Sequence, residues 1–307
     1  MKNLKYLILF IGLALFASCS QLDVEGDAMN KGSKAQFYGA IGDVQTRVSG
    51  DNWVAGDLIG IYAINHGKTL GGDGAIFGRF ANVKYITDAA GRFTVASGGS
   101  PIVYPPTGNN LNFVAYYPWK ETIADYTYPI DVSTQVFADI DLLYANEANA
   151  GHNKDNADAD IALSFNHMLS KVVVMIERGD GVNSLANLEA AFNVVTDGAL
   201  NLANGVVRTG TTKGDIAPVV EIATGGNWAT ITAMVVPGQN MSGVAFNFSL
   251  DGKDYTVNPD ERVLDSSKQY IYKYKMLADA IEAVGTGVIA PWETEHDDGT
   301  AGDLNPI

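Results

Sequence analysis

The sequence predicts an all-β protein made of two antiparallel β-sandwich domains in tandem. Short segments of alternating apolar and polar residues follow one another along the chain, and turn-forming residues separate them. The 33 glycines, 14 tyrosines and 12 phenylalanines are typical of strands and turns. Long amphipathic helices are not indicated, since only residues 184–192 offer about two turns of helical spacing.

The expected strands can be justified in chain order, beginning with residues 35–41. The apolar run at residues 112–117 ends before Pro118, which cannot donate a hydrogen bond to a strand ladder. Residues 172–176 are apolar on both faces and therefore belong in the middle of a sheet. Further strands are expected at residues 57–64, 93–96, 161–165, 171–177, 228–236 and 269–277. The last of these places Tyr270, Tyr272, Tyr274 and Met276 on one face and Lys273 and Lys275 on the other.

One hairpin can be predicted to the residue. Asp251-Gly252 is a favourable pair for a two-residue turn of type I′. Such a turn sets Leu250 opposite Lys253 and Phe248 opposite Tyr255. It also sets Phe246 opposite Val257. The Phe248–Tyr255 and Phe246–Val257 pairs then lie on the same face of the hairpin.

A polar stretch at residues 146–160 separates two strand-rich halves of similar size. Each half is long enough to close a core of its own. We therefore expect an N-terminal domain at residues 35–157 and a C-terminal domain at residues 158–307.

The N-terminus has the order of a lipoprotein export signal. Lys2 and Lys5 precede an apolar run that is too short to span a membrane, and small residues then lead to Cys19. This order predicts a signal peptide at residues 1–18 and acylation of the Cys19 sulfur. The polar residues 19–34 form a tether from the lipid to the fold. Two or more acyl chains hold a protein firmly on a membrane. An ordinary secretory signal with an incidental cysteine is the alternative.

The chain is acidic, with 20 Lys and Arg residues against 35 Asp and Glu residues and a formal net charge of −15. This charge repels nucleic acid and anionic lipid, so no nucleic-acid partner is expected. Cys19 is the only cysteine. Its acylation leaves no thiol for a disulfide, and an exported protein of this kind must be stabilised by burial.

No pattern favours catalysis or a bound cofactor. Residues 66–69 resemble the end of a phosphate-binding loop, but Tyr62 stands where that loop needs glycine. Asp155, Asp158 and Asp160 suggest a calcium loop, yet its glycine and final glutamate are missing. A solvated linker and a weak, irregular calcium site remain the two alternatives there. The four histidines lack metal-binding spacing, and no serine lies in a Gly-x-Ser-x-Gly turn. We expect no catalytic residue, no metal, no cofactor and no enzymatic activity.

Short motifs follow one another over nearly the whole chain. They are Cys19 in its lipobox, Thr46-Arg47, WVAGDLIGIY from Trp53, FVAYYP from Phe113, DLLYA from Asp141, LSFNHMLSKV from Leu163 and IAPW from Ile289. In this order and spacing they resemble the fimbrillin family, the type V pilins of Gram-negative anaerobes.

The resemblance implies two transthyretin-like β-sandwich domains, lipoprotein export to the outer membrane and assembly by strand exchange. In similar pilins a trypsin-like protease cuts after an arginine placed like Arg47. The cut makes Val48 the new N-terminus and releases the lipid and the first strand. The groove that opens accepts an extended segment of another subunit, and the chain end from near Ala280 is the expected donor. An exposed loop arginine without a role is the alternative for Arg47.

Three functions fit these observations. The favoured one is a structural or adhesive fimbrial subunit at the outer membrane and cell surface, with other fimbrial subunits as partners. The second is a lipoprotein that binds a glycan or a host or bacterial surface ligand and does not polymerise. The third is a β-sandwich hydrolase with dispersed carboxylates. Limited trypsin treatment separates the first two, because only a polymerising subunit gives a detergent-resistant ladder.

Overall fold

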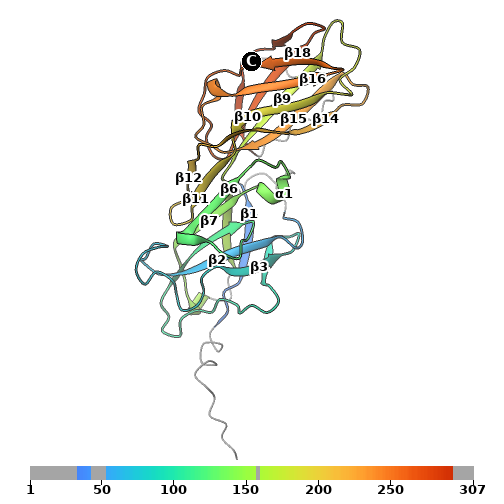
Figure 1. The fold of residues 1–307 in the computed structure, drawn as a ribbon. Coiled ribbons are helices and arrows are strands. Elements are labelled where there is room, and N and C mark those ends of the chain that lie inside the picture. The colour runs from blue at the N-terminus through green and yellow to red at the C-terminus, as the bar shows by residue number, and fades with distance from the viewer. Residues whose placement is uncertain (1–32, 43–52, 157–159, 293–307) are drawn as a thin grey trace, which may run out of the picture.

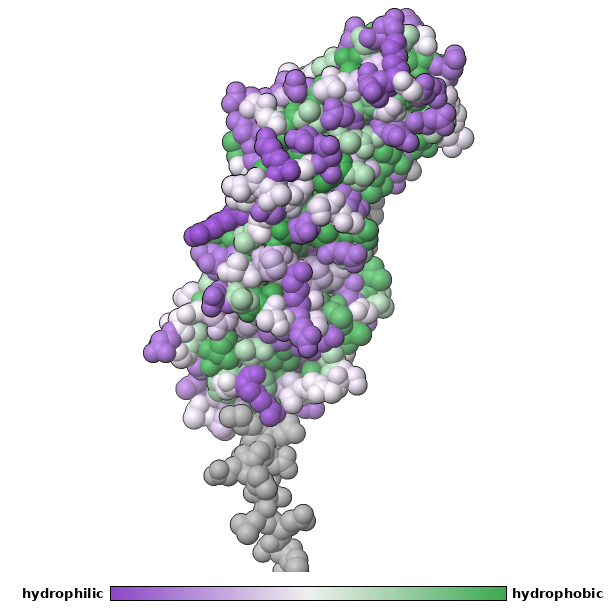
Figure 2. All heavy atoms as spheres, in the orientation of Figure 1, coloured by the Kyte–Doolittle hydropathy of each residue, from purple (hydrophilic) through white to green (hydrophobic). Residues whose placement is uncertain are grey.

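The computed structural model describes residues 33–42, 53–156 and 160–292, and these form an all-β protein. Figure 1 shows two lobes stacked along one long axis, with the first strands in one lobe and β9 (Ser170–Arg178) and most later strands in the other. Hydrophilic and hydrophobic residues are intermixed over the face shown in Figure 2.

The N-terminal lobe is a closed barrel with the strand order β1-β4-β3-β2-β5-β7-β8. The ring closes because β1 pairs with β4 on one side and with β8 on the other. Phe37, Phe113 and Phe165 are fully buried in its core. The strands are β1 (Phe37–Ile41), β2 (Leu58–Asn65), β3 (Val83–Thr87), β4 (Arg92–Val95), β5 (Leu111–Tyr117), β7 (Leu143–His152) and β8 (Ile161–His167).

The C-terminal lobe is a sandwich of two sheets. One sheet has the order β13-β10-β16-β17, and the other has β14-β15-β9-β18, with β19 and β20 on the remaining side of β18. Phe192 and Phe246 from the first sheet meet Tyr270 and Tyr272 from the second in the core between them. The strands are β10 (Glu189–Val195), β13 (Lys213–Ile216), β14 (Val219–Ile222), β15 (Trp228–Val235), β16 (Ala245–Leu250), β17 (Lys253–Val257), β18 (Lys268–Met276), β19 (Ile281–Ala283) and β20 (Val288–Pro291).

A third sheet joins the two halves of the chain. It pairs β6 (Thr127–Asp131) with β11 (Asp197–Asn201), and β11 with β12 (Val206–Thr209). Side chains from both halves, including Tyr128 and Leu200, share one buried cluster there. The lobes are therefore joined through a shared core.

Helices are few and short in the described ranges. They are η2 (Ala124–Tyr126), α1 (Phe137–Ile140), η3 (Lys154–Asn156) and η4 (Met241–Gly243). In the part of the chain that the structure describes, no helix has the length and apolar character needed to cross a membrane.

The predicted strand patterns are confirmed where alternation or double-sided apolarity was clear. The β16–β17 hairpin has the expected register, with Leu250 opposite Lys253, Phe248 opposite Tyr255 and Phe246 opposite Val257. The central position expected for residues 172–176 is also confirmed, because β9 lies between β15 and β18. In β18 the face formed by Tyr270, Tyr272, Tyr274 and Met276 is buried.

Other expectations need correction. The N-terminal half was expected to form a sandwich, but its strands form one sheet that closes on itself. Residues 184–192 contain no helix, because Leu185 and Leu188 pack into the core from a turn and β10 begins at Glu189. The polar stretch at 146–160 is not simply a linker, since β7 continues through it to His152 with Asn146 exposed.

The same stretch bears on the domain boundary expected between residues 157 and 158. Strand β8 follows that point, and it pairs with β1 and with β7 of the N-terminal barrel. A boundary at 157/158 would divide paired strands, whereas one between β8 and β9 keeps the barrel whole. The polar composition of this stretch therefore does not by itself mark a boundary, and the division at 157/158 stays a prediction.

Candidate functional site

The strand β1 closes the barrel and is the candidate site. It runs parallel to β8 from Phe37 opposite Ile161 to Ile41 opposite Phe165, and it is antiparallel to β4. Beyond these ladders, the backbone N–H of Gly42 donates to the carbonyl of Phe165 at 2.8 Å. Without β1, the facing edges of β4 and β8 would lose their backbone partners, which is costly when they cannot reach water.

The side chain of Phe37 fills a pocket in the barrel core and is 0% exposed. Its ring lies 5.3 Å from the ring of Tyr85 and 5.1 Å from that of Phe113, centroid to centroid, both in edge-to-face geometry. The Tyr85 hydroxyl accepts a hydrogen bond from the backbone N–H of Ile102 at 3.0 Å. Burial raises the pKa of Tyr85 to about 12, so this wall of the pocket is uncharged.

Gly39 lies where no side chain fits. A Cβ built on this residue would lie 2.4 Å from Cζ of Phe93 and 3.1 Å from Cε2 of Phe165. The indole of Trp53 completes this aromatic wall, with edge-to-face contacts to both phenylalanines. Its Nε1–H donates to the carbonyl of Gly39 at 2.8 Å. The close approach of β1 to these rings thus requires glycine at position 39.

An ion pair joins the two strands that flank β1. Arg92 of β4 and Asp160, directly before β8, make two bonds, with NH1–Oδ1 at 3.3 Å and NH2–Oδ2 at 2.9 Å. Both side chains are substantially exposed. The pair therefore links the strands on either side of β1 at the surface rather than in the core.

The C-terminal edge has a different character. Among the described strands, β19 and β20 pair only with β18, and the apolar side chains of Val284, Val288 and Ile289 are 45%, 52% and 54% exposed. A guanidinium nitrogen of Arg262 donates to the carbonyl of Gly287 at 3.3 Å. This edge is held by backbone pairing and by Ile281, which packs against the core, while Val284, Val288 and Ile289 remain outside it.

Trp292 anchors the end of this edge. It is 4% exposed and stacks on the ring of His167 at 4.4 Å, centroid to centroid. The Nδ1 atom of His167 lies 2.7 Å from Oδ1 of Asp141. Trp292, like Trp53, is a buried core residue.

The comparisons with known proteins agree with one another. A family model described as "Fimbrillin-like" matches residues 46–292. The chain belongs to the fimbrillin-like family. The protein named "Putative fimbrium subunit Fim1C" from Bacteroides uniformis is 32% identical to this chain over 271 residues, which cover 82% of this chain and 81% of that protein.

Two solved structures resemble this fimbrillin-like protein along most of their length. One is described as a "putative cell adhesion protein" from Bacteroides uniformis and has a TM-score of 0.67, with 27% identity over 84% of this chain and 98% of the other. The second carries the same description, comes from Bacteroides ovatus and has a TM-score of 0.68, with 19% identity over 86% and 99% of the two chains. At that identity the second structure supports the fold alone.

The site residues predicted from the sequence of this fimbrillin-like protein are Cys19, Arg47 and Val48. All three lie outside the described residues. The structure describes the chain up to Gly42 and again from Trp53, so the Arg47–Val48 bond belongs to the connection between β1 and the rest of the barrel. Sequence reasoning missed the roles of Phe37 and Gly39, although an aromatic residue and a glycine two positions apart on one face of a strand are a readable signal.

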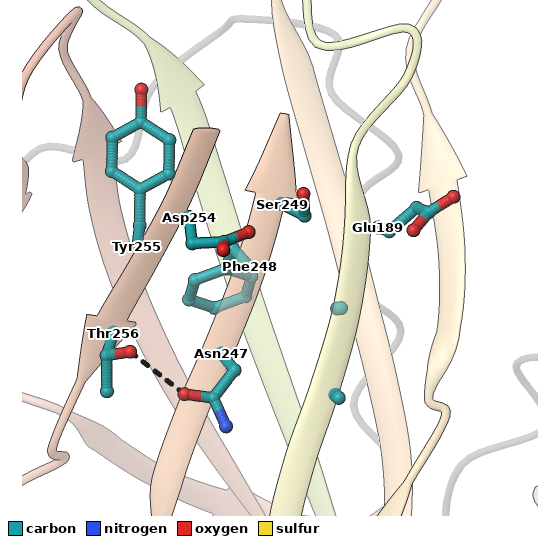
Figure 3. Close-up of a pocket in the computed structure, with 9 residues that line it drawn as sticks. Glu189, Asn247, Phe248, Ser249, Asp254, Tyr255 and Thr256 are labelled. Atoms are coloured by element: carbon teal, nitrogen blue, oxygen red, sulfur yellow. Dashed lines mark hydrogen bonds between the residues drawn. The ribbon is translucent and has the colours of Figure 1, made fainter. Parts of the chain in front are cut away.

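The outer face of the β10–β16–β17 sheet has a hollow of about 350 Å³ (Figure 3). Hydroxyl, amide and carboxylate side chains are among those that line it, and the Thr256 hydroxyl donates to Oδ1 of Asn247 at 2.9 Å. The lining residues are Glu189, Ala190, Ala191, Asn247, Phe248, Ser249, Asp254, Tyr255 and Thr256.

Within the described ranges, no cluster of three or more His, Cys, Asp or Glu side chains is arranged to hold a metal ion. In the segment where a calcium loop was considered, Asp155 is bonded to Lys154 and Asp160 to Arg92.

Proposed function

We propose that this protein is a structural or adhesive subunit of fimbriae, polymerised by donor-strand exchange after cleavage between Arg47 and Val48. The observation that carries the proposal is the position of β1. This strand closes the barrel, yet it is joined to the rest of the chain on its C-terminal side only through the connection that contains Arg47. Cleavage there makes β1 separable without breaking any other part of the fold.

Removal of β1 leaves a groove that another strand can refill. The groove has two backbone edges, β4 and β8, and an apolar floor that includes the pocket of Phe37. An added strand remakes the backbone hydrogen bonds and refills the pocket, which is the general physics of β-augmentation. The partners are other fimbrial subunits, as the name of the 32% identical relative also suggests.

The chain end from near Ala280 is the proposed donor. In this structure it forms β19 and β20 at an edge, where Val288 and Ile289 are about half exposed. Donation therefore moves apolar side chains out of water. The anchored Trp292 opposes release, because its buried indole must leave the ring of His167.

We further propose that the protein is a lipoprotein of the outer membrane, with a signal peptide at residues 1–18, an acylated Cys19 and a tether to residue 34. The C-terminal sandwich corresponds to a transthyretin-like domain, and it follows the barrel in tandem, joined to it between β8 and β9. The protein acts without a cofactor and is not an enzyme. The family and its relatives support a location at the cell surface in fimbriae.

Size-exclusion chromatography after limited trypsin treatment tests the assembly proposal. The uncut chain should be monomeric, the cut wild type should form detergent-resistant polymers, and Arg47→Ala should form none. Arg79→Ala is the matched control, because Arg79 is an exposed arginine elsewhere in the barrel lobe and its loss should change nothing. Polymers from Arg47→Ala would show that this arginine is not the switch.

Metabolic labelling with a clickable fatty acid tests the lipid. The wild type should be labelled, and Cys19→Ala should lose the label and the membrane association. Unchanged labelling of Cys19→Ala would contradict lipidation at this residue.

A second candidate function is a surface lipoprotein that binds a glycan or a host or bacterial surface ligand without polymerising. The hollow of Figure 3 favours it, because hydroxyl, amide and carboxylate groups there can hydrogen-bond sugar hydroxyls. This function predicts that cut wild type stays monomeric. It also predicts that the full chain binds a glycan array and that Asn247→Ala weakens the binding.

A further inference from the structure

We propose that the β1 groove selects its occupant by a two-residue rule, a glycine and a large apolar residue two positions apart, and that Gly287 and Ile289 of a second copy of this chain satisfy it. The inference rests on the proposed strand exchange and specifies which residues are exchanged. It assigns a register and a direction to the donor strand.

The rule follows from two of the inward-facing residues of β1, Phe37 and Gly39, which are the two that are fully enclosed, whereas Ile41 at the end of the strand is only partly buried. At position 39 a Cβ would lie 2.4 Å from Cζ of Phe93, which is closer than side chains approach one another. The ring of Phe93 cannot easily move, because Trp53 and Phe165 pack against it with centroids 5.4 Å and 6.0 Å away. Position 39 therefore admits glycine alone.

At position 37 the requirement is the opposite. The pocket holds a phenylalanine that is 0% exposed between Tyr85 and Phe113. A small occupant would leave a cavity, and a cavity of that size strongly destabilises a core. The groove therefore favours a large apolar side chain two residues away from the glycine.

The expected donor segment, residues 280–292, contains two glycines, Gly285 and Gly287. If Gly285 takes position 39, the residue at position 37 is Ala283 or Gly287, according to the direction of the strand. If Gly287 takes position 39, that residue is Gly285 or Ile289. Ile289 alone among these is large, so the rule selects Gly287 at position 39 with Ile289 at position 37.

This register fixes the direction of the donor. Because Ile289 follows Gly287 whereas Phe37 precedes Gly39, the donor runs opposite to β1. It is then antiparallel to β8, with which β1 is parallel, and parallel to β4. The longer of the two ladders becomes antiparallel, the pairing that is slightly more stable per residue.

Apart from Trp292, the donor residues around the selected pair lose little apolar contact when they leave their own sheet. Ile289 is 54% exposed there, and Val288, which would take the outward position of the 41% exposed Tyr38, is 52% exposed. In its own chain Gly287 faces Tyr272, whose Cε1 atom would be 3.1 Å from an added Cβ. A side chain at 287 therefore loosens the donor from its own sheet, so any block to assembly must arise in the acceptor groove.

The test uses the full mature chain with residues 44–50 replaced by the recognition sequence of a site-specific protease, so that β1 can be released without reliance on Arg47. Polymer formation is followed by light scattering. We expect Gly287→Val to assemble at least tenfold more slowly than wild type and Ile289→Ala several-fold more slowly. Val284→Ala, which removes a similarly exposed side chain outside the selected pair, should assemble at the wild-type rate. Wild-type assembly by Gly287→Val would overturn the rule.

A peptide assay separates failure of the rule from failure of strand exchange between subunits. Cut protein freed of its β1 peptide is offered synthetic peptides of residues 33–42 and 284–291, and binding is measured by native mass spectrometry. Both should bind, and the Gly39→Val and Gly287→Val versions should bind at least tenfold more weakly. If cut wild type never polymerises, the assembly proposal fails while this assay still decides the rule. Equal binding of the valine peptides contradicts it.

Discussion

The first and last strands of the described fold, β1 and the β19–β20 pair, contrast in what they bury. The strand β1 pairs on both sides, and Phe37 lies at the centre of an aromatic core. The strands β19 and β20 pair on one side only, and Val288 and Ile289 face water. The first segment leaves a shaped groove when it departs, whereas the second carries apolar side chains that its own fold does not use. A replaceable strand and a donatable strand therefore have opposite burial patterns.

The largest expected effect is on the free energy of unfolding, and it tests this contrast directly. Phe37→Ala should lower the free energy of unfolding of the intact chain by about 3–5 kcal/mol, because it leaves a cavity between Tyr85 and Phe113. Ile289→Ala should change it by no more than about 0.5 kcal/mol, because the side chain is 54% exposed. Urea denaturation measures both. Equal effects of the two substitutions would remove the contrast.

The next effect concerns the anchor of the C-terminal edge. Trp292→Ala removes the stack on His167 and a side chain that is only 4% exposed. The amides of β20 should then exchange with deuterium about a hundredfold faster, which corresponds to about 3 kcal/mol of local stability. The amides of β1 should keep their protection, and Val284→Ala serves as the control. Unchanged exchange in β20 would show that Trp292 does not hold this edge.

A pH titration sharpens the contrast further. Burial raises the pKa of Tyr85 in the barrel and of Tyr272 beneath the C-terminal edge to about 12 each. Since these folded-state values lie above the unfolded value of 10.0, the stabilisation is complete below about pH 10 and is lost as the pH rises toward 12. Release of β1 exposes Tyr85, so its pKa should fall toward 10 while that of Tyr272 stays near 12. Phenolate absorbance of the cut chain, compared with Tyr85→Phe and Tyr272→Phe, measures this, and a shift assigned to Tyr272 would contradict it.

The smallest effect belongs to the ion pair beside β1. Arg92 and Asp160 have side chains that are 51% and 38% exposed. A double-mutant cycle with Arg92→Gln and Asp160→Asn should therefore give a coupling free energy below about 1 kcal/mol, and salt should weaken it. A coupling of several kcal/mol would mean that the pair is a principal constraint on β4 and β8.

Local chemistry explains why some parts of this fold could be predicted. The hairpin at Asp251-Gly252 was assigned to the residue, because the turn type and the face of Phe246 and Phe248 both depend on neighbours in sequence. The closure of the barrel could not be predicted in this way, because the pairing of β1 with β8 joins residues more than a hundred positions apart.

The candidate site could be predicted from the sequence only in part. Arg47 could be selected because it follows a predicted strand in a polar segment, but the need for glycine at position 39 comes from rings on β4 and β8. Polar composition was an ambiguous guide to the domain boundary for a related reason, since the polar residues after Asn146 continue a paired strand. Composition indicates exposure, and only pairing shows which strands belong together.

The central claim is that β1 blocks assembly until it is removed. Mass spectrometry of the polymer fraction, dissolved under denaturing conditions after protease treatment, tests this most directly. The account predicts that polymerised subunits begin at Val48 and that the peptide ending at Arg47 is absent from them, while the monomer fraction retains it. Polymers whose subunits still hold the intact β1 segment would contradict the claim.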